Sequence, residues 1–317
     1  MPARRIHWLD GLRSSLMLLG VVLHSAYPYS QGVGWLVRDP QRNQFFQNLT
    51  RSIHLFRMPA FFLIAGFFAT LLLRRSSPAE FLCERLRRIG VPLLSTLLTF
   101  NLVQAWLLQK GGTPGAWLPS GDEVQVMWSS GSMVGHLWFL VYLLVFCTIL
   151  AACTRPIRRL AASRWPAWLA TGSGFRLMLG LAVTCSAMVA AMDHLAPTLL
   201  SHEYLGLVDP SELLVYAPFF GAGMLLEMDE TLLLRFSSPD PGTVLAGIVA
   251  LTVTWSEAGN HTLAGKSLRL LASSLLVWMV IRLLFGGFRK IASNASPFFR
   301  YLSDASYSIY LMHHVIV

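Results

Sequence analysis

The chain has 317 residues, of which 54% are hydrophobic and only 13% charged, and its formal net charge is +9. Soluble domains carry about 25% charged residues, so this composition, with a mean hydropathy of +0.54, argues against a soluble enzyme and favours a membrane protein. The positive charge does not indicate nucleic-acid binding, because the basic residues gather in short loops between apolar runs.

Nine apolar runs follow one another along the chain, most of them long enough to approach the thickness of a bilayer at about 1.5 Å per residue. We expect a single domain over residues 1–317, folded as an all-α bundle of about nine to ten transmembrane helices. The last run reaches Val317 after about twelve residues, short of the roughly 20 that a span needs, so we expect the last helix to be incomplete. The runs are Leu12–Tyr29, Ile53–Leu73, Gly90–Leu108, His136–Cys153, Phe175–Leu195, Leu213–Leu226, Thr243–Trp255, Leu268–Phe285 and the run that opens near Ala305.

The basic residues are divided unequally between the two sides of such a bundle. With a cytoplasmic N-terminus, 18 of the 25 Lys and Arg residues face the cytoplasm and 7 face outward. Cytoplasmic loops of membrane proteins carry an excess of Lys and Arg. We therefore expect a multi-pass protein whose N-terminus is cytoplasmic. The outward-facing residues are Arg38, Arg42, Arg51, Arg57, Lys110, Lys266 and Arg269.

The first run carries three ionisable residues. At about 100° per residue, Arg13 and His24 lie within about 20° of each other around the helix axis, about 16 Å apart along it, and Asp10 lies about 60° from their line. Ionisable groups within a membrane usually face the protein interior or a water-filled cavity, and imidazole suits general-base work near neutral pH. Asp10 and Arg13 could instead anchor the helix at the interface, and His24 could be a core histidine bonded to a carbonyl.

The second run opens with His54 and Arg57, which are three residues apart and share a helix face. Arg57 could serve a site or anchor the helix at the interface. Gly66, further along the same run, would let another helix approach closely.

Arginines precede the third run. Arg85 and Arg88 are three residues apart, so they can point the same way on a helix, and guanidinium groups suit phosphate. A cytoplasmic loop is also expected to be basic with no ligand at all. The residues alone leave a phosphate site and a topological signal both open.

Polar residues interrupt the fourth and last runs as well. His136 stands directly in front of an apolar run, where an aromatic belt would explain Trp138 but not the histidine. Tyr307, Tyr310 and His314 recur at intervals of three and four, which predicts a polar stripe on the last helix. Such stripes line cavities or pack against other polar helices.

Familiar cofactor motifs are absent from the sequence. None of the four cysteines pairs with another at a metal-ligand spacing, and we find no phosphate-binding glycine loop, zinc pattern or Gly-x-Ser-x-Gly turn. We expect no metal and no permanently bound cofactor, and chemistry that comes from histidines, arginines and a few carboxylates.

In order and spacing, these motifs resemble the membrane acyltransferase-3 family over nearly the whole chain. Some of them are similar to the branch of that family that succinylates periplasmic glucans. The family-level motifs are Leu9–Arg13 followed by His24, the stretch Phe61–Phe68, Arg85–Arg88 before Ile89 and Pro92, and Ser306–Tyr310 with a following histidine. The branch-level motifs are His54–Met58, His136–Leu140 and the doubled His313 and His314.

The resemblance implies an O-acyltransferase of the bacterial inner membrane, with an acyl-CoA donor reached from the cytoplasm and a periplasmic or envelope glycan as acceptor. The acyl group would be succinyl or acetyl. It implies a catalytic role for His24, as general base or acyl carrier, and donor binding by Arg85 and Arg88. The remaining candidates are Arg13 and Asp10 beside His24 in catalysis, and His54, Arg57, His136 and His314 at the acceptor or the oxyanion.

Two other functions compete with this hypothesis. A transporter or flippase of a glycan or lipid-linked sugar would line its path with the same polar stripe, but many transporters show an inverted repeat with broken helices, and we see none here. A structural or partner-binding subunit would leave the histidines without a role.

Overall fold

The computed structural model describes residues 6–31, 39–110, 134–162, 173–195, 208–256, 262–294 and 296–316. In these ranges the regular structure is helical, with one isolated bridge between Ser30 and Asn43. The helices are α1 (His7–Ala26), α2 (Gln44–Leu73), α3 (Pro78–Arg85), α4 (Val91–Leu98), α5 (Phe100–Lys110), α7 (Trp138–Ala152), α8 (Thr154–Ala162), α10 (Gly174–Leu195), α12 (Pro210–Met228), α13 (Glu230–Phe236), α14 (Pro241–Trp255), α15 (Leu263–Ile291) and α16 (Pro297–Met312), with short turns at η1 (Tyr27–Tyr29), η2 (Leu86–Gly90), η3 (Gly135–Leu137) and η4 (His313–Val315).

The expected all-α membrane fold is confirmed, but the expected number of spans is not. Each of the nine apolar runs falls on helix, yet among the described residues five helices are both long and apolar enough to cross a membrane. The others are shorter or carry polar residues, so length and composition alone do not qualify them. The five are Gln44–Leu73, Pro78–Gln104, Gly135–Ala152, Gly174–Met192 and Leu263–Ile291.

Local start signals, a capping side chain or a proline, determine where two of the helices begin, rather than the apolar runs. α2 starts at Gln44, nine residues before the expected Ile53, because the Asn43 side chain accepts the backbone N–H of Phe45 at 2.8 Å. The last helix likewise begins at Pro297 instead of near Ala305, since proline suits the first helical turn.

The third span begins before its arginines rather than after them. Ser77 and Glu80 form a capping box that starts α3 at Pro78, and helix continues through the π turn η2 into α4. Arg85 and Arg88 therefore lie on a helix, and the expectation of a loop at this place is wrong. A five-residue π turn also changes the spacing between side chains on either side of it.

The tightest crossing in the core joins α2 and α12. A side chain at Gly66 would collide with the backbone carbonyl of Phe220, and one at Gly223 would collide with that of Leu63. The two helix backbones therefore touch through paired glycines, as the sequence predicted for Gly66. Phe62 stacks on Tyr216 beside this crossing, with ring centroids 4.7 Å apart.

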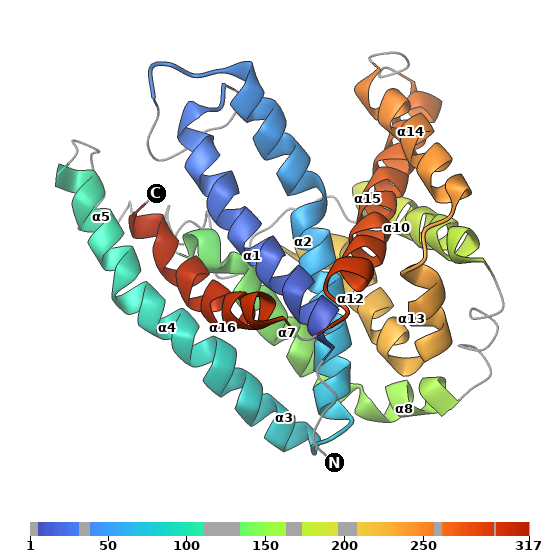
Figure 1. Ribbon diagram of the computed structural model, residues 1–317, viewed down its shortest axis with the longest axis horizontal. Coiled ribbons are helices and arrows are strands. Elements are labelled where there is room, and N and C mark those ends of the chain that lie inside the picture. The colour runs from blue at the N-terminus through green and yellow to red at the C-terminus, as the bar shows by residue number, and fades with distance from the viewer. Residues whose placement is uncertain are drawn as a thin grey trace.

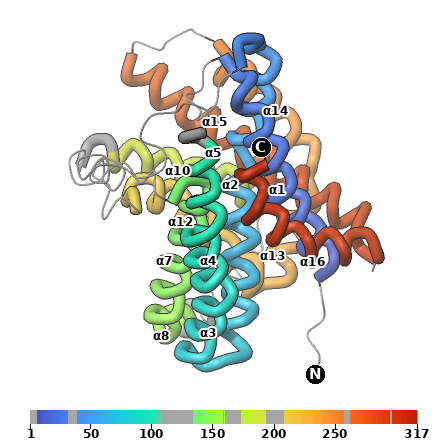
Figure 2. The backbone as a smooth tube through the Cα atoms, turned by 90° about the vertical axis from the view of Figure 1, so that its left-hand side faces the viewer, coloured from blue at the N-terminus to red at the C-terminus, as the bar shows by residue number. Residues whose placement is uncertain are grey.

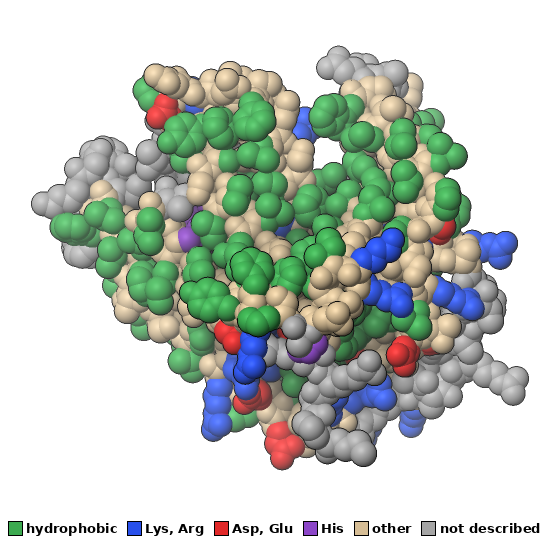
Figure 3. Space-filling view, in the orientation of Figure 1, with side chains coloured by type: hydrophobic (Ala, Val, Ile, Leu, Met, Phe, Trp, Pro, Cys, Tyr) green, Lys and Arg blue, Asp and Glu red, His purple; other side chains and the backbone are tan. Residues whose placement is uncertain are grey.

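Around this crossing the remaining helices build two sides of the bundle. α1 runs beside α2, and α16 packs across α1 with the α3–α4–α5 run on its other flank (Figures 1 and 2). On the other side α14 lies along α15 (Figure 1). Hydrophobic side chains cover much of the visible surface, while most Lys, Arg, Asp and Glu side chains lie in the lower half and along the right-hand side (Figure 3). The chain is a multi-pass membrane protein.

Candidate functional site

Four histidines from three elements meet between α1, α7 and α16, and we call them the histidine cluster. His24, His136 and His313 are buried, with 6%, 7% and 3% of their surface exposed, and His314 is half-buried. The nearest ring centroids are those of His136 and His314, which stack 4.1 Å apart at 7°. His24 and His313 are in contact although 289 residues separate them in the sequence, so only the tertiary fold assembles the cluster.

These histidines lie close together because each is at a helix end or in a short turn next to one. His24 lies in the last turn of α1, just before η1. His136 lies in the short turn η3, which Gly135 enters with a φ of 52°, a conformation that favours glycine. α16 stops at Met312, and the tighter turn η4 follows with His313 and His314.

Hydrogen bonds link the histidines to one another and to neighbouring residues. Nδ1 of His24 lies 2.7 Å from Nε2 of His313, and Nδ1 of His313 lies 2.6 Å from the backbone oxygen of Tyr310. Nδ1 of His314 lies 2.9 Å from Nε2 of Gln104, on α5. Among the described residues the buried Nε2 of His136 has no hydrogen-bond partner. This leaves polar capacity for a ligand within the cluster.

Arg57 lies beside the cluster, with 6% of its surface exposed. Its guanidinium packs over the Tyr310 ring at 5.8 Å and occupies the space that Gly20 leaves open on α1. Within the described part of the chain its Nε has no hydrogen-bond partner and no carboxylate pairs with it. A buried cation without an anion is costly and is a feature of sites that receive negative charge.

A small cavity adjoins this arginine. Its volume is about 10 Å³, about the size of one water molecule. The lining residues are Leu16, Met17, Arg57, Met58, Phe61, Phe139 and Tyr310. His54, one turn before Arg57 on α2, is exposed and makes no described contact with the histidine cluster.

Asp10 and Arg13 lie at the opposite end of α1, about 16 Å from His24 along the helix. They form an ion pair of 3.4 Å. Arg13 also donates to Ser303 of α16 at 3.2 Å and packs over the Phe68 ring. These two candidates are therefore separated from the histidines and cannot share one reacting atom with them.

Arg88 lies beside the middle of α16, and Arg85 lies three residues before it. Arg88 is exposed and pairs with Glu84, while its backbone oxygen accepts the Tyr307 hydroxyl at 3.3 Å. Arg85 is partly buried over the Phe81 ring, and its buried Nε has no hydrogen-bond partner among the described residues. α16 thus passes Arg13 and Arg88 in its middle, at Ser303 and Tyr307, and the histidine cluster lies just past its end.

The structure adds His313 to the residues that the sequence singled out for the site. The doubled histidine was visible in the sequence, but helical spacing from Tyr307 and Tyr310 favoured His314. That spacing fails here because the helix ends at Met312 and the tighter turn carries both rings into the cluster. Tyr310 joins the site through its backbone oxygen and its contact with Arg57.

Three of the histidines could also hold a metal ion. One ring nitrogen from each of His24, His313 and His314 lies within 4.8 Å of the other two nitrogens. The expectation of no metal stays a prediction.

The chain matches a known protein family and several curated proteins over nearly its whole length. The model of a family described as an acyltransferase domain matches residues 6–317. Glucans biosynthesis protein C of Shigella dysenteriae serotype 1 is 27% identical over 99% of this chain and 82% of its own length. The proteins of the same name from Escherichia coli strain SMS-3-5 and Salmonella typhi are 27% and 28% identical, each over 99% of this chain and over 82% and 83% of their own lengths. No solved structure gives a significant match.

Proposed function

We propose that this chain, which belongs to the acyltransferase-3 family, moves an acetyl or succinyl group from cytoplasmic acyl-CoA to hydroxyls of a periplasmic or envelope glycan. The observation that carries the proposal is the histidine cluster beside a buried arginine that has no carboxylate partner in the described structure. The name shared by the relatives, glucans biosynthesis protein C, supports a glucan as the acceptor.

The chemistry requires a base, because a sugar hydroxyl is a weak nucleophile at neutral pH. In the direct route, His24 takes the hydroxyl proton while the oxygen attacks the thioester carbonyl carbon. The carbon–sulfur bond then breaks, and the proton passes from His24 to the departing CoA thiolate. A positioned base of this kind contributes about 10²–10⁴-fold in rate.

A second route uses the same histidine as a carrier. A ring nitrogen of His24 attacks the thioester carbon, the carbon–sulfur bond breaks and CoA leaves as a thiolate. The sugar hydroxyl then attacks the acyl carbon, the carbon–nitrogen bond breaks to restore neutral His24, and the hydroxyl proton passes to solvent, from which the thiolate regains a proton. This route separates donor and acceptor in time, which suits a donor and an acceptor on opposite sides of a membrane.

Arg57 is the group best placed to stabilise the oxyanion that forms on the carbonyl. It is already buried and held by Tyr310, so it would not need to reorganise as the charge develops. His136 and His314, whose ring centroids lie 6.3 and 4.9 Å from that of His24, would orient the acceptor.

Arg85 and Arg88 would bind the phosphates of the donor, since guanidinium groups favour phosphate oxygens. Arg13 contacts the middle of α16 as well, where Ser303 accepts its hydrogen bond. The distance from there to His24 is about 16 Å, so the donor's acyl arm would extend along α1 and α16. With a cytoplasmic N-terminus in the bacterial inner membrane, the Arg13 end of α1 faces the cytoplasm.

A reconstitution experiment tests the proposal. Vesicles that contain the purified protein receive ¹⁴C-labelled acetyl-CoA or succinyl-CoA on one side and an unlabelled glucan on the other. We expect label on glucan hydroxyls, and the donor that works identifies the acyl group. Transport of unmodified glucan without label would favour a flippase instead. If neither labelling nor transport is detected, both functions are contradicted.

A further inference from the structure

The backbone of α16 fixes the proton position on His313. Nδ1 of His313 lies 2.6 Å from the backbone oxygen of Tyr310, and a carbonyl oxygen can only accept a hydrogen bond. Nδ1 of His313 therefore carries a proton. The Arg57 guanidinium on the neighbouring Tyr310 ring disfavours a second positive charge here, so the neutral ring is favoured. In the neutral ring Nε2 has no proton and is an acceptor.

The contact with His24 continues this pattern. The His24 and His313 rings are nearly parallel, at 11°, with centroids 4.9 Å apart, while Nδ1 of His24 and Nε2 of His313 are only 2.7 Å apart. The centroid distance exceeds the nitrogen distance by about two ring radii. The rings therefore lie side by side in one plane with the two nitrogens aimed at each other. That is the geometry of an in-plane N–H···N hydrogen bond.

A shared metal ion fits this pair less well. Zinc lies about 2.0–2.1 Å from each histidine nitrogen, so a tetrahedral site would hold two ligand nitrogens about 3.3 Å apart. The separation of 2.7 Å is shorter than that and matches a hydrogen bond.

From these contacts we propose that His313 is a positioning residue that fixes the tautomer of His24. Because Nε2 of His313 accepts, Nδ1 of His24 donates, and the neutral His24 ring then carries its lone pair on Nε2. Resting on the proposed function, this assigns Nε2 of His24 as the nitrogen that takes the hydroxyl proton or carries the acyl group. When Nε2 of His24 gains the proton, its Nδ1–H stays bonded to His313.

Three substitutions at His313 separate this role from a merely structural one. A glutamine side chain reaches about as far as Nε2 of the histidine it replaces, and its amide oxygen can accept a hydrogen bond from Nδ1 of His24. An asparagine side chain reaches only as far as Nδ1 of that histidine, so it can form a hydrogen bond with the Tyr310 backbone but not with His24. Phenylalanine fills the volume and accepts nothing. His7→Phe, on the N-terminal turn of α1, serves as the matched control.

We expect His313→Phe and His313→Asn to lower kcat by about 10²-fold or more, because a wrong histidine tautomer is costly in general-base catalysis. KM for acyl-CoA and for the glucan should change by less than about threefold, since neither variant touches Arg85 or Arg88. His313→Gln should keep kcat within about tenfold of wild type, and His7→Phe should be unchanged. The proposal is wrong if His313→Phe keeps kcat within about threefold, or if glutamine restores nothing over phenylalanine.

A spectroscopic measurement decides the question without turnover. In ¹⁵N-histidine-labelled protein, the His24 signals are those that His24→Ala removes. We expect the wild type to show the proton of neutral His24 on Nδ1, and His313→Phe to lose that preference. A proton on Nε2 in the wild type would overturn the proposal. If the wild type transfers no acyl group, the proposed function fails, while this spectrum still decides the tautomer.

Discussion

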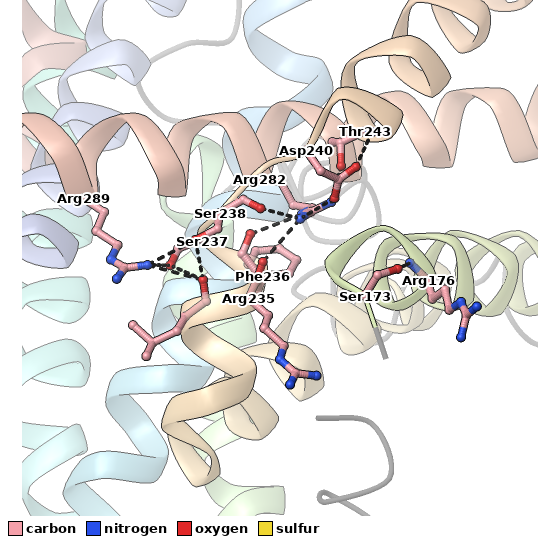
Figure 4. Close-up of polar contacts among 11 residues, drawn as sticks. Ser173, Arg176, Arg235, Phe236, Ser237, Ser238, Asp240, Thr243, Arg282 and Arg289 are labelled. Atoms are coloured by element: carbon pink, nitrogen blue, oxygen red, sulfur yellow. Dashed lines mark hydrogen bonds and ion pairs between the residues drawn. The ribbon is translucent and has the colours of Figure 1, made fainter. Parts of the chain in front are cut away.

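Two regions of the molecule bury polar side chains among apolar helices, and they treat them differently. In the arginine node, Arg282 of α15 is fully buried, and each of its three guanidinium nitrogens donates to acceptors at the end of α13, in the α13–α14 connection or at the start of α14 (Figure 4). The acceptors are the backbone oxygens of Arg235, Phe236 and Ser238, the Thr243 hydroxyl and the Asp240 carboxylate.

The histidine cluster is less completely satisfied. Nε2 of His136 and Nε of the adjacent Arg57 are buried with no hydrogen-bond partner in the described residues. A buried polar group left without a partner costs about 1–3 kcal/mol. We therefore propose that the arginine node maintains the fold, while the histidine cluster keeps binding capacity at the expense of stability.

The largest expected effect is the loss of catalysis in His24→Ala. We expect transfer to fall by about 10²–10⁴-fold, because a general base or carrier is removed, while the protein inserts and elutes as wild type does. His24→Gln should fail similarly, since an amide can hydrogen-bond but cannot take the proton. The measurement is labelled acyl transfer in vesicles. Activity of folded His24→Ala within about threefold of wild type would exclude both catalytic routes.

Next in size is the loss of stability in Arg282→Met. Removal of one partner from a buried charged network costs about 3–5 kcal/mol. We expect a lower thermal midpoint and yield, with the protein that does fold retaining its KM for acyl-CoA. Arg289→Met is the matched control, on the same helix but partly exposed and bonded to Ser237. Equal stability of the two variants would show that the node is not a structural element.

A smaller effect is expected at the donor arginines. If Arg85 and Arg88 hold donor phosphates, Arg85→Ala or Arg88→Ala should raise KM for acyl-CoA about tenfold or more, since a hydrogen bond to a charged group contributes about 1.5–3 kcal/mol. Lysine should restore this only partly, because it lacks the planar fork. Arg87→Ala, exposed on the same π turn, is the control. Unchanged donor kinetics in both alanine variants would leave the arginines as topological signals.

Asp240→Asn should have a small effect on the arginine node. Burial raises the pKa of Asp240, but the backbone N–H of Thr243 and the Arg282 guanidinium hold that pKa below its usual value of 3.8. A depressed pKa means that the ion pair stabilises the fold above the unfolded-state value and loses this contribution as the pH falls through the folded-state pKa. Because 38% of the side chain is exposed, we expect a loss of less than about 1 kcal/mol near neutral pH.

Thermal unfolding of wild type and Asp240→Asn across pH tests this assignment. The difference in midpoint should shrink as the buffer is acidified below 3.8. A difference that grows on acidification would contradict the assignment.

The smallest expected effect on activity belongs to the orientation test. In a protein whose exposed Cys83 is replaced by serine, Ala79→Cys and Gln31→Cys should both remain active. With the N-terminus inside, an impermeant thiol reagent should label Gln31→Cys in intact cells and spare Ala79→Cys. The reverse pattern would overturn the orientation. Gln31 is a better reporter than its neighbour Ser30, whose side chain is buried.

The sequence predicted the parts of the fold that local patterns determine. All nine apolar runs lie on helices, and Gly66 does mark a close helix crossing. Helix starts were missed where a cap extends the helix past the apolar run, as at Asn43 and at Ser77. The number of spans could not be read from hydropathy, because several helices of the bundle carry polar residues that only the tertiary structure satisfies.

For the candidate site, the sequence identified His24, His136 and His314, and the structure brings them together. His54 remains on the exposed side of α2, since two residues that share a face at a spacing of three still differ by about 60° around the axis. The roles of His313 and Arg282 could not be predicted, because they depend on contacts with residues 289 and 46 positions away in the sequence. No local sequence pattern indicates such contacts.

α16 contacts both parts of the candidate path: Ser303 and Tyr307 in its middle bond to Arg13 and Arg88, and His313, just past its last residue, bonds to His24. The number of residues between these contacts therefore fixes how one is rotated and displaced relative to the other along the helix. One residue inserted between Tyr307 and Tyr310 would advance the far end by about 1.5 Å and rotate it by about 100°. A point substitution changes one contact, whereas such an insertion would turn His313 away from His24 and leave every side chain chemically intact. The spacing of this helix should therefore tolerate exchange of residues far better than change of length.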